Sequence, residues 1–230
     1  MLLEPHYIGS AGIRHAAITH TAPSEDDYAK TSPKLERALD RLSFRAVLAL
    51  AAGTAEWIAW RLAEHGPSQD ALLWIEAVWA GGIDVRYTRD WDWPAEPKRG
   101  PRSGALVTAT GLLAEVFRLF RILENGITVQ TVYLSHLARH VLPSKPAFDG
   151  WLKQCLERLT LLYTRSPEDE LGPPVPRTAL DPECDFKPTL TNELLAKFLE
   201  GLSHDSASNP YLRSPQDMLR LGFPGTPYRI

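Results

Sequence analysis

Two histidines, His136 and His140, stand four residues apart in a stretch with helical periodicity. At that spacing two imidazole rings project from the same face of a helix and can reach one metal ion. No glutamate stands between them as in the HExxH pattern, so a carboxylate ligand would have to come from elsewhere in the fold. Alternatively, both rings lie at the edge of the apolar stripe of the helix and bind no metal. One hypothesis is therefore a metal-dependent hydrolase that uses His136 and His140.

The segment 83–102 combines aromatic and acidic side chains at Trp91, Asp92 and Trp93. Its several prolines and glycines prevent a continuous helix or strand, so we expect a long loop. Exposed aromatic residues flanked by charge are typical anchors of protein–protein interfaces. Alternatively, both tryptophans fold back onto the body of the protein. The segment is a candidate partner-binding surface.

A second long loop is expected at 165–188, where six prolines interrupt the chain. It carries six carboxylates, Glu168, Asp169, Glu170, Asp181, Glu183 and Asp185. Such a loop suits a basic partner, because complementary charge speeds encounter and penalises wrong partners. Alternatively, it is a solvated connection stiffened by proline.

Arg45 and Glu56 fall on one face of an expected helix, with Ala49 and Ala52 between them. Small residues between two charged ones are typical of a close helix crossing or of a polar groove. The alternative is an exposed helix edge on which both charges find ion-pair partners.

Common enzyme motifs are missing from the chain. It has no G-x-S-x-G elbow, no phosphate-binding P-loop and no dinucleotide fingerprint, and no Cys–His spacing indicates structural zinc. We therefore expect no cofactor and favour binding over catalysis.

The amino-acid composition and net charge limit the kinds of molecule that the protein is expected to bind. The 230 residues are 44% hydrophobic and 23% charged, with a formal net charge of −3, as in ordinary folded domains. Nucleic acids and anionic membranes usually bind proteins with a clear positive excess, so neither is expected as a partner. The chain begins without a signal-peptide pattern, and Cys155 and Cys184 have no evident reason to pair. The expected location is the cytoplasm, with both thiols reduced.

The elements that position these residues are helices. Residues 1–31 show no sustained period and are expected to form an irregular arm. Apolar residues then recur at helical spacing, and serine–proline pairs at 32–33 and 214–215 mark helix starts. The expected helices cover about 33–65, 68–81, 103–124, 128–142, 145–164, 190–202 and 214–221.

The helix at 103–124 is apolar around most of its circumference, which predicts a place in the middle of the core. No internal repeat is present. The predicted fold is all-α, a single-domain helical array or orthogonal bundle of about seven helices with long proline-rich loops.

In general character, a small, compact helical protein with few motifs resembles the immunity proteins with which bacteria neutralise toxins. That resemblance implies a non-enzymatic protein-binding module that inhibits a cognate toxin. A basic toxin or nuclease would fit the acidic loop at 165–188, with Trp91, Asp92 and Trp93 as a second contact.

Overall fold

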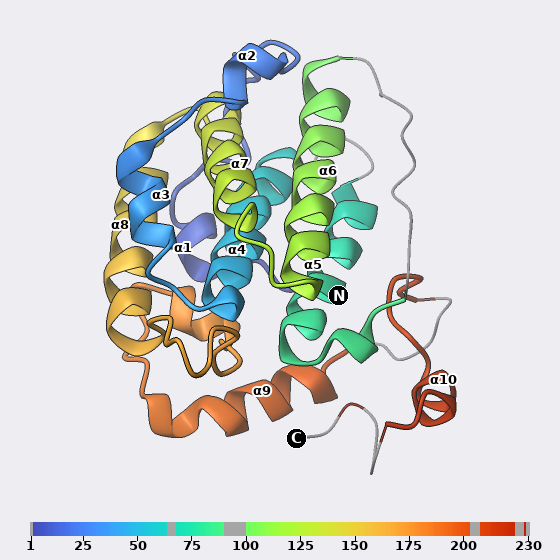
Figure 1. Ribbon diagram of the computed structural model, residues 1–230. Helices are drawn as coiled ribbons and strands as arrows, with labels where there is room; N and C mark the ends of the chain where they lie inside the picture. The colour runs from blue at the N-terminus through green and yellow to red at the C-terminus, as the bar shows by residue number, and fades with distance from the viewer. Residues whose placement is uncertain (1, 64–67, 90–99, 203–207, 224–227, 229–230) are drawn as a thin grey trace.

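The computed structural model describes residues 2–63, 68–89, 100–202, 208–223 and 228. Within these residues the chain is helical, and only isolated bridges, without a β-sheet, connect extended segments. The helices pack side by side into one all-α domain, as the sequence predicts (Figure 1).

The α-helices are α1 (His6–Gly9), α2 (Glu25–Tyr28), α3 (Pro33–Leu39), α4 (Phe44–Leu62), α5 (Ser68–Ile83), α6 (Pro101–Arg121), α7 (Ile127–Val141), α8 (Lys145–Leu162), α9 (Thr191–Glu200) and α10 (Pro215–Arg220). Short 3-10 helices are η2 (Val85–Tyr87), η3 (Arg177–Leu180) and η4 (Pro188–Leu190). The long helices α4, α6 and α7 run roughly alongside one another, and α9 lies across one end of them (Figure 1).

The centre of the core is α4, which contacts α5, α6, α7 and α8. Every residue of α4 except Arg45 is buried. Many of them are alanines, and small side chains let neighbouring helices approach from several directions. The central helix is therefore α4.

The sequence predicts that the helix at 103–124 lies in the middle of the core. This prediction is wrong, because α4 occupies that place. In the structure α6 packs on α4 and α7 but leaves Arg118 and Arg121 exposed. Of the described helices, α6 alone is long and apolar enough to cross a membrane, with a mean hydropathy of 1.3 over an apolar window that is half buried in the protein. Core helices of folded domains share that length and composition.

The prediction of one continuous helix at 33–65 is also wrong, because the structure has two helices there, α3 and α4. The first, α3, ends at Leu39, and Ser43 starts α4 by accepting a hydrogen bond from the backbone N–H of Ala46. Between them the chain pairs with the segment after α8, where Arg165 N donates to Arg41 O at 2.8 Å. A serine cap and an outside pairing partner thus replace one helical turn.

The N-terminal residues pack on the body through buried Ile8 and Ile13. Arg61, a buried residue near the end of α4, donates to the carbonyl oxygens of Arg14 and Ala17 at 3.2 and 2.9 Å. Residues 2–7 lie in the same region of the molecule as η3 and α9, where Arg177 Nη2 donates to Leu3 O at 2.7 Å.

Candidate ligand-binding cavity

The two histidines of the metal hypothesis lie half-buried on α7. His140 is engaged by the N-terminal segment, since its Nε2 lies 3.1 Å from Thr21 O and its Nδ1 lies 3.7 Å from a carboxylate oxygen of Asp27. Burial lowers the pKa of His136. Across the described ranges, no group of three histidine, cysteine or acidic side chains could hold a metal ion. The described residues thus bring no third ligand to His136 and His140.

Five of the six carboxylates of the 165–188 segment fall into two groups, and the sixth, Asp181, is half-buried in the chain between them. Glu168, Asp169 and Glu170 are exposed on a turn that leads toward the start of α4. Glu183 and Asp185 are also exposed, but they contact His6 and Lys187, respectively. The chain between the two groups is not a solvated loop, since buried Val175, Ala179 and Leu180 attach it to the core.

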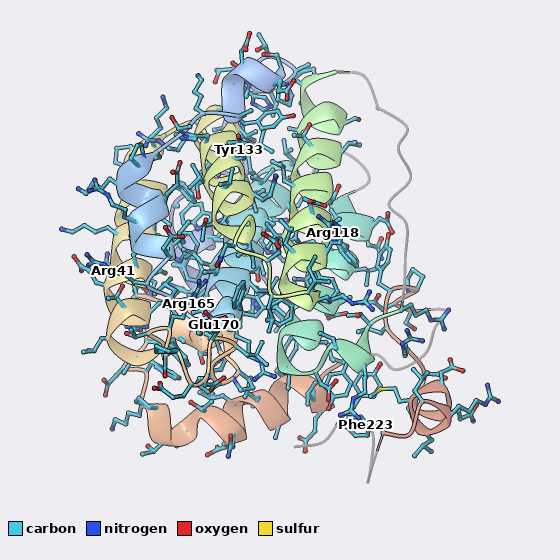
Figure 2. All side chains as sticks on the ribbon, in the orientation of Figure 1. Arg41, Arg118, Tyr133, Arg165, Glu170 and Phe223 are labelled. Atoms are coloured by element: carbon cyan, nitrogen blue, oxygen red, sulfur yellow. The ribbon has the colours of Figure 1, made fainter. Side chains whose placement is uncertain are left out.

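The first group forms what we call the acidic turn, residues 166–172. Its backbone is fixed to α4, because Phe44 N donates to Glu170 O at 3.0 Å and Arg45 N donates to Leu171 O at 3.1 Å. Gly172 has a φ of +71°, and a Cβ there would lie 2.4 Å from Ser43, so only glycine fits. Figure 2 shows Arg165 close to Glu170, and Arg41 lines the same surface hollow together with Asp40. The two arginines offset part of the negative charge at the acidic turn.

Trp91, Asp92 and Trp93, the other predicted partner-binding residues, lie outside the described residues.

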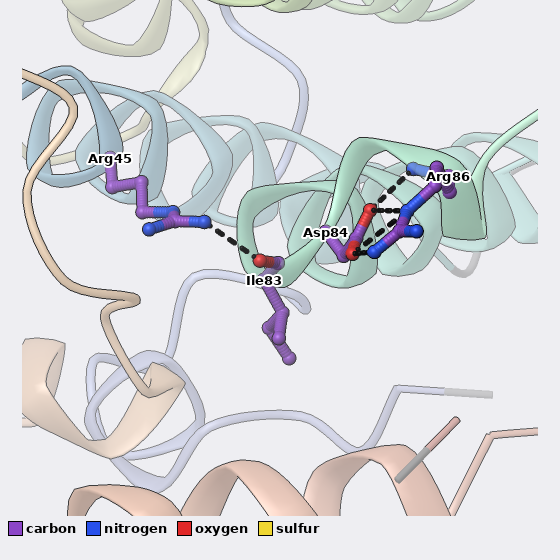
Figure 3. A network of polar contacts seen from close by, with 4 residues as sticks. All are labelled: Arg45, Ile83, Asp84 and Arg86. Atoms are coloured by element: carbon purple, nitrogen blue, oxygen red, sulfur yellow. Dashed lines mark hydrogen bonds and ion pairs between the residues drawn. The ribbon is translucent and has the colours of Figure 1, made fainter. Parts of the chain in front are cut away.

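The face of α4 with Arg45, Ala49, Ala52 and Glu56 lies against α5. Arg45 crosses to the end of α5, where its Nη2 donates to Ile83 O at 2.9 Å (Figure 3) and its Nε donates to Gly82 O at 2.8 Å. The two charged residues therefore flank a close helix crossing, which is one of the interpretations that their spacing allows. They are not an exposed edge.

Beyond Glu56 the structure has a cavity of about 460 Å³. It is bounded by residues 2–7, by the segment 176–181 and by α9, with Glu76 of α5 also in its wall. Its apolar lining consists of Leu2, Leu3, Pro5, Pro176, Leu194, Phe198, Gly201 and Leu202. Apolar walls with a few converging polar groups are typical of sites for small molecules.

An ion pair fixes the polar side of this cavity. Arg177 of η3 donates from Nε to Glu56 Oε1 at 2.8 Å and from Nη2 to Glu56 Oε2. The Glu56 side chain is fully buried and also accepts a hydrogen bond of 2.7 Å from Trp79 Nε1. Burial alone would lower the pKa of Arg177, but the charge of Glu56, the hydrogen bonds to it and the nearby Tyr7 and Glu76 together raise the pKa. The Arg177 side chain is therefore charged and held in place by Glu56.

Two hydroxyl groups in the cavity wall are buried without a hydrogen-bond partner in the described part of the chain, those of Tyr7 and Thr178. The Tyr7 side chain is fixed by its ring, which stacks on Trp151 with centroids 5.8 Å apart. Burial, reinforced by the charge of Glu56, raises the pKa of Tyr7, so its hydroxyl stays protonated and able to donate. Most buried polar groups in proteins have a partner, so these two hydroxyls are free to pair with a ligand.

Charged groups also reach this wall. Glu76 is buried on α5, and its Oε2 accepts a hydrogen bond of 2.9 Å from Asn209 Nδ2. Asp181 and Lys197 complete the charged lining, one from the segment after η3 and one from α9.

Sequence reasoning missed this cavity. It assigned Arg177 to a solvated acidic loop and Tyr7 to an irregular arm. Glu56, which pairs with Arg177, and Trp151, on which Tyr7 stacks, each lie more than 100 residues away in sequence. The usable signal was Glu56, a carboxylate within an apolar helix, which requires a buried cation.

Comparison of the chain with protein-family models, with curated proteins and with solved structures gives no match. The function is therefore argued from the site itself.

Proposed function

We propose that the protein is a binding protein that holds a small organic molecule in the cavity between residues 2–7, η3 and α9. The observation that carries this proposal is the pair of buried hydroxyls, of Tyr7 and Thr178, that face no protein partner in the described residues. A buried polar group without a partner costs about 1–3 kcal/mol, and a ligand that pairs with it removes that cost.

The geometry of the cavity supports the same proposal. Its volume of about 460 Å³ falls within the range of roughly 300–1,000 Å³ of small-molecule sites. The ion pair of Glu56 with Arg177 and the stacking of Tyr7 on Trp151 fix the polar groups before any ligand arrives. Preorganised groups lose little entropy on binding, which favours affinity.

The proposal is tested by ligand-observed NMR with a panel of small organic fragments. The variant Leu194→Trp places a large ring in the cavity wall, whereas Leu161→Trp changes a side chain on α8 that is 81% exposed. We expect fragments to bind the wild type and Leu161→Trp and to be lost from Leu194→Trp. A panel that gives no binder to the wild type, or binders indifferent to Leu194→Trp, would contradict the proposal.

The second candidate function is docking of a basic protein partner on the acidic turn, as an immunity-type inhibitor would dock on a toxin or nuclease. It is favoured by one observation, that Glu168, Asp169 and Glu170 are exposed on a backbone fixed to α4. Rigid carboxylates can steer a basic partner at little entropic cost. Arg41 and Arg165 beside the turn weaken that field and make this the second choice.

The docking proposal is tested by a pull-down from the source cells, followed by reversal of the three carboxylates to lysine. A matched control reverses three exposed carboxylates elsewhere, Glu157, Glu193 and Glu200. Reversal in the acidic turn should weaken binding and reduce its salt dependence, and the control should change both much less. Equal effects of the two triple variants would exclude the acidic turn.

We also propose a cytoplasmic location with both thiols reduced. It is supported by Cys155 and Cys184, which are both free. Thiol titration under denaturing, non-reducing conditions should find two free groups, and finding none would overturn the proposal.

A further inference from the structure

We infer that the ligand of this cavity is an uncharged molecule with an apolar body and a polar end that accepts hydrogen bonds, such as a ketone, ester, amide or alcohol. This inference rests on the proposed small-molecule function and adds the chemical class of the ligand.

The need for an acceptor follows from the donors in the wall. Arg177 can only donate, and its Nε and Nη2 are used by Glu56 and by Leu3 O, the latter at 2.7 Å. No described residue accepts a hydrogen bond from its Nη1, and its side chain is 21% exposed where it lines the cavity. The hydroxyls of Tyr7 and Thr178 can donate as well. The wall therefore offers donors, and a ligand oxygen with two lone pairs can accept hydrogen bonds from two of them.

We infer that the ligand is uncharged because the buried cation of the wall, Arg177, already has a counter-ion. The positive charge of Arg177 is taken up by the carboxylate of Glu56, which it contacts through two nitrogens. The other cation of the wall, Lys197, is exposed on α9, where water solvates its charge, so a ligand anion would lie beside Glu76 and Asp181 without a buried counter-ion. A ligand cation would lie beside Arg177. Burying a charge without a dedicated counter-ion is costly, whereas a neutral oxygen meets no such penalty.

The apolar body follows from the other walls. Leu194, Phe198 and Leu202 of the α9 region line the cavity together with Leu2 and Leu3 of the N-terminal segment. Burial of apolar ligand surface there supplies the main driving force, at about 25 cal/mol per Å² removed from water. A short alkyl or aryl group matches these side chains.

The experiment compares four probes that share one eight-carbon chain, namely 2-octanone, 1-octanol, octanoate and octylammonium, by titration calorimetry on the full chain near neutral pH. We expect the ketone and the alcohol to bind and both ions to bind at least about tenfold more weakly, which corresponds to about 1.4 kcal/mol.

Variants test the assigned donors. Tyr7→Phe and Thr178→Val each remove one buried hydroxyl without a described partner, so each should lower the affinity for 2-octanone by roughly two- to tenfold while leaving the fold intact. Tyr7→Phe should also raise the melting temperature of the ligand-free protein, because it removes an unpaired buried group. The matched control is Tyr133→Phe, a half-buried tyrosine on α7 outside the cavity (labelled in Figure 2), which should leave the affinity unchanged.

The outcomes separate this inference from the function on which it rests. If fragments bind the cavity but octanoate or octylammonium binds as well as the ketone, small-molecule binding stands and the inferred class is wrong. Unchanged ketone affinity in Tyr7→Phe and Thr178→Val overturns the class as well. If neither these probes nor any fragment binds, the proposed function itself fails.

Discussion

Glu56 on α4 and Arg177 on η3 are 121 residues apart in sequence, and they form a two-point ion pair in which the Glu56 side chain is fully buried. Trp79 Nε1 donates a third hydrogen bond to the same carboxylate. This contact joins the central helix to the long segment after α8, and it places Arg177 in the cavity wall.

Breaking the ion pair from one side should be costly. Arg177→Met leaves the carboxylate of Glu56 buried without a cation, and we expect a loss of about 3–5 kcal/mol in the free energy of unfolding. Replacing both partners, as Glu56→Gln with Arg177→Met, removes the buried charge and keeps an acceptor for Trp79. The double variant should recover most of the loss in denaturant titrations. A double variant no more stable than Arg177→Met would show that the charge is not the cause.

A second close contact involves Gly81 near the end of α5. A Cβ at this position would lie 2.5 Å from Cζ of Phe117, so α5 and α6 can approach only because residue 81 is glycine. We expect Gly81→Ala to destabilise the protein by about 1–3 kcal/mol, the usual cost of overpacking. The control is Gly111→Ala in α6, where a Cβ meets nothing within 4 Å. That change should instead stabilise by about 0.5–1 kcal/mol through helix propensity.

The same contact predicts coupling between the two positions. In the double variant Gly81→Ala with Phe117→Leu, the smaller side chain at 117 should make room for the new methyl group. The combined loss in unfolding free energy should then fall short of the sum of the single losses. Strict additivity would argue against the contact.

Phe117 and Phe120 also test the packing of α6. Both are at least 95% buried, and Phe117 meets the ring of Trp74 edge-on at 5.9 Å. Each change to alanine should cost about 3–5 kcal/mol. Leu161→Ala, at a position that is 81% exposed, should stay within about 0.5 kcal/mol of the wild type. Losses below a kilocalorie at both phenylalanines would contradict the packing of α6 against the core.

Helical periodicity predicted the fold class and most of the helices, because apolar residues at helical spacing report a buried face directly. It failed where polar residues are buried. Glu56 and Arg61 interrupt the apolar pattern of α4, and both are buried because residues distant in sequence offset the cost. Arg177 pairs with Glu56, and the carbonyl oxygens of Arg14 and Ala17 accept hydrogen bonds from Arg61. Helical periodicity therefore did not indicate that α4 is the central helix, and it predicted α6 in that place.

The candidate site was less predictable than the fold. The spacing of Arg45 and Glu56 did indicate a helix crossing, because both residues belong to one helix with fixed geometry. Tyr7 and Arg177 lie in segments without regular period, and pairings over such separations leave no local pattern. Composition made the segment 165–188 resemble a solvated loop, although buried Val175, Ala179 and Leu180 hold it on the core.

The last prediction concerns acid and two half-buried histidines. Burial lowers the pKa of His20 and of His136 below the ordinary value of 6.5. His20 Nδ1 and His136 Nε2 are buried without a partner in the described residues, so a proton there would be poorly solvated. Near pH 6.5 these two histidines therefore bind protons in the unfolded chain, whereas in the folded chain they bind protons only at a lower pH. By linkage, the stability present above pH 6.5 is lost as the pH falls through this window.

Denaturant titrations at about pH 7.5 and about pH 5.5 measure this loss in the wild type. The double variant His20→Gln with His136→Gln should show a smaller decrease in unfolding free energy between the two pH values. His15→Gln, at an exposed position, serves as the control and should keep the decrease of the wild type. If the double variant loses as much stability in acid as the wild type, other groups are responsible and these two histidines titrate normally.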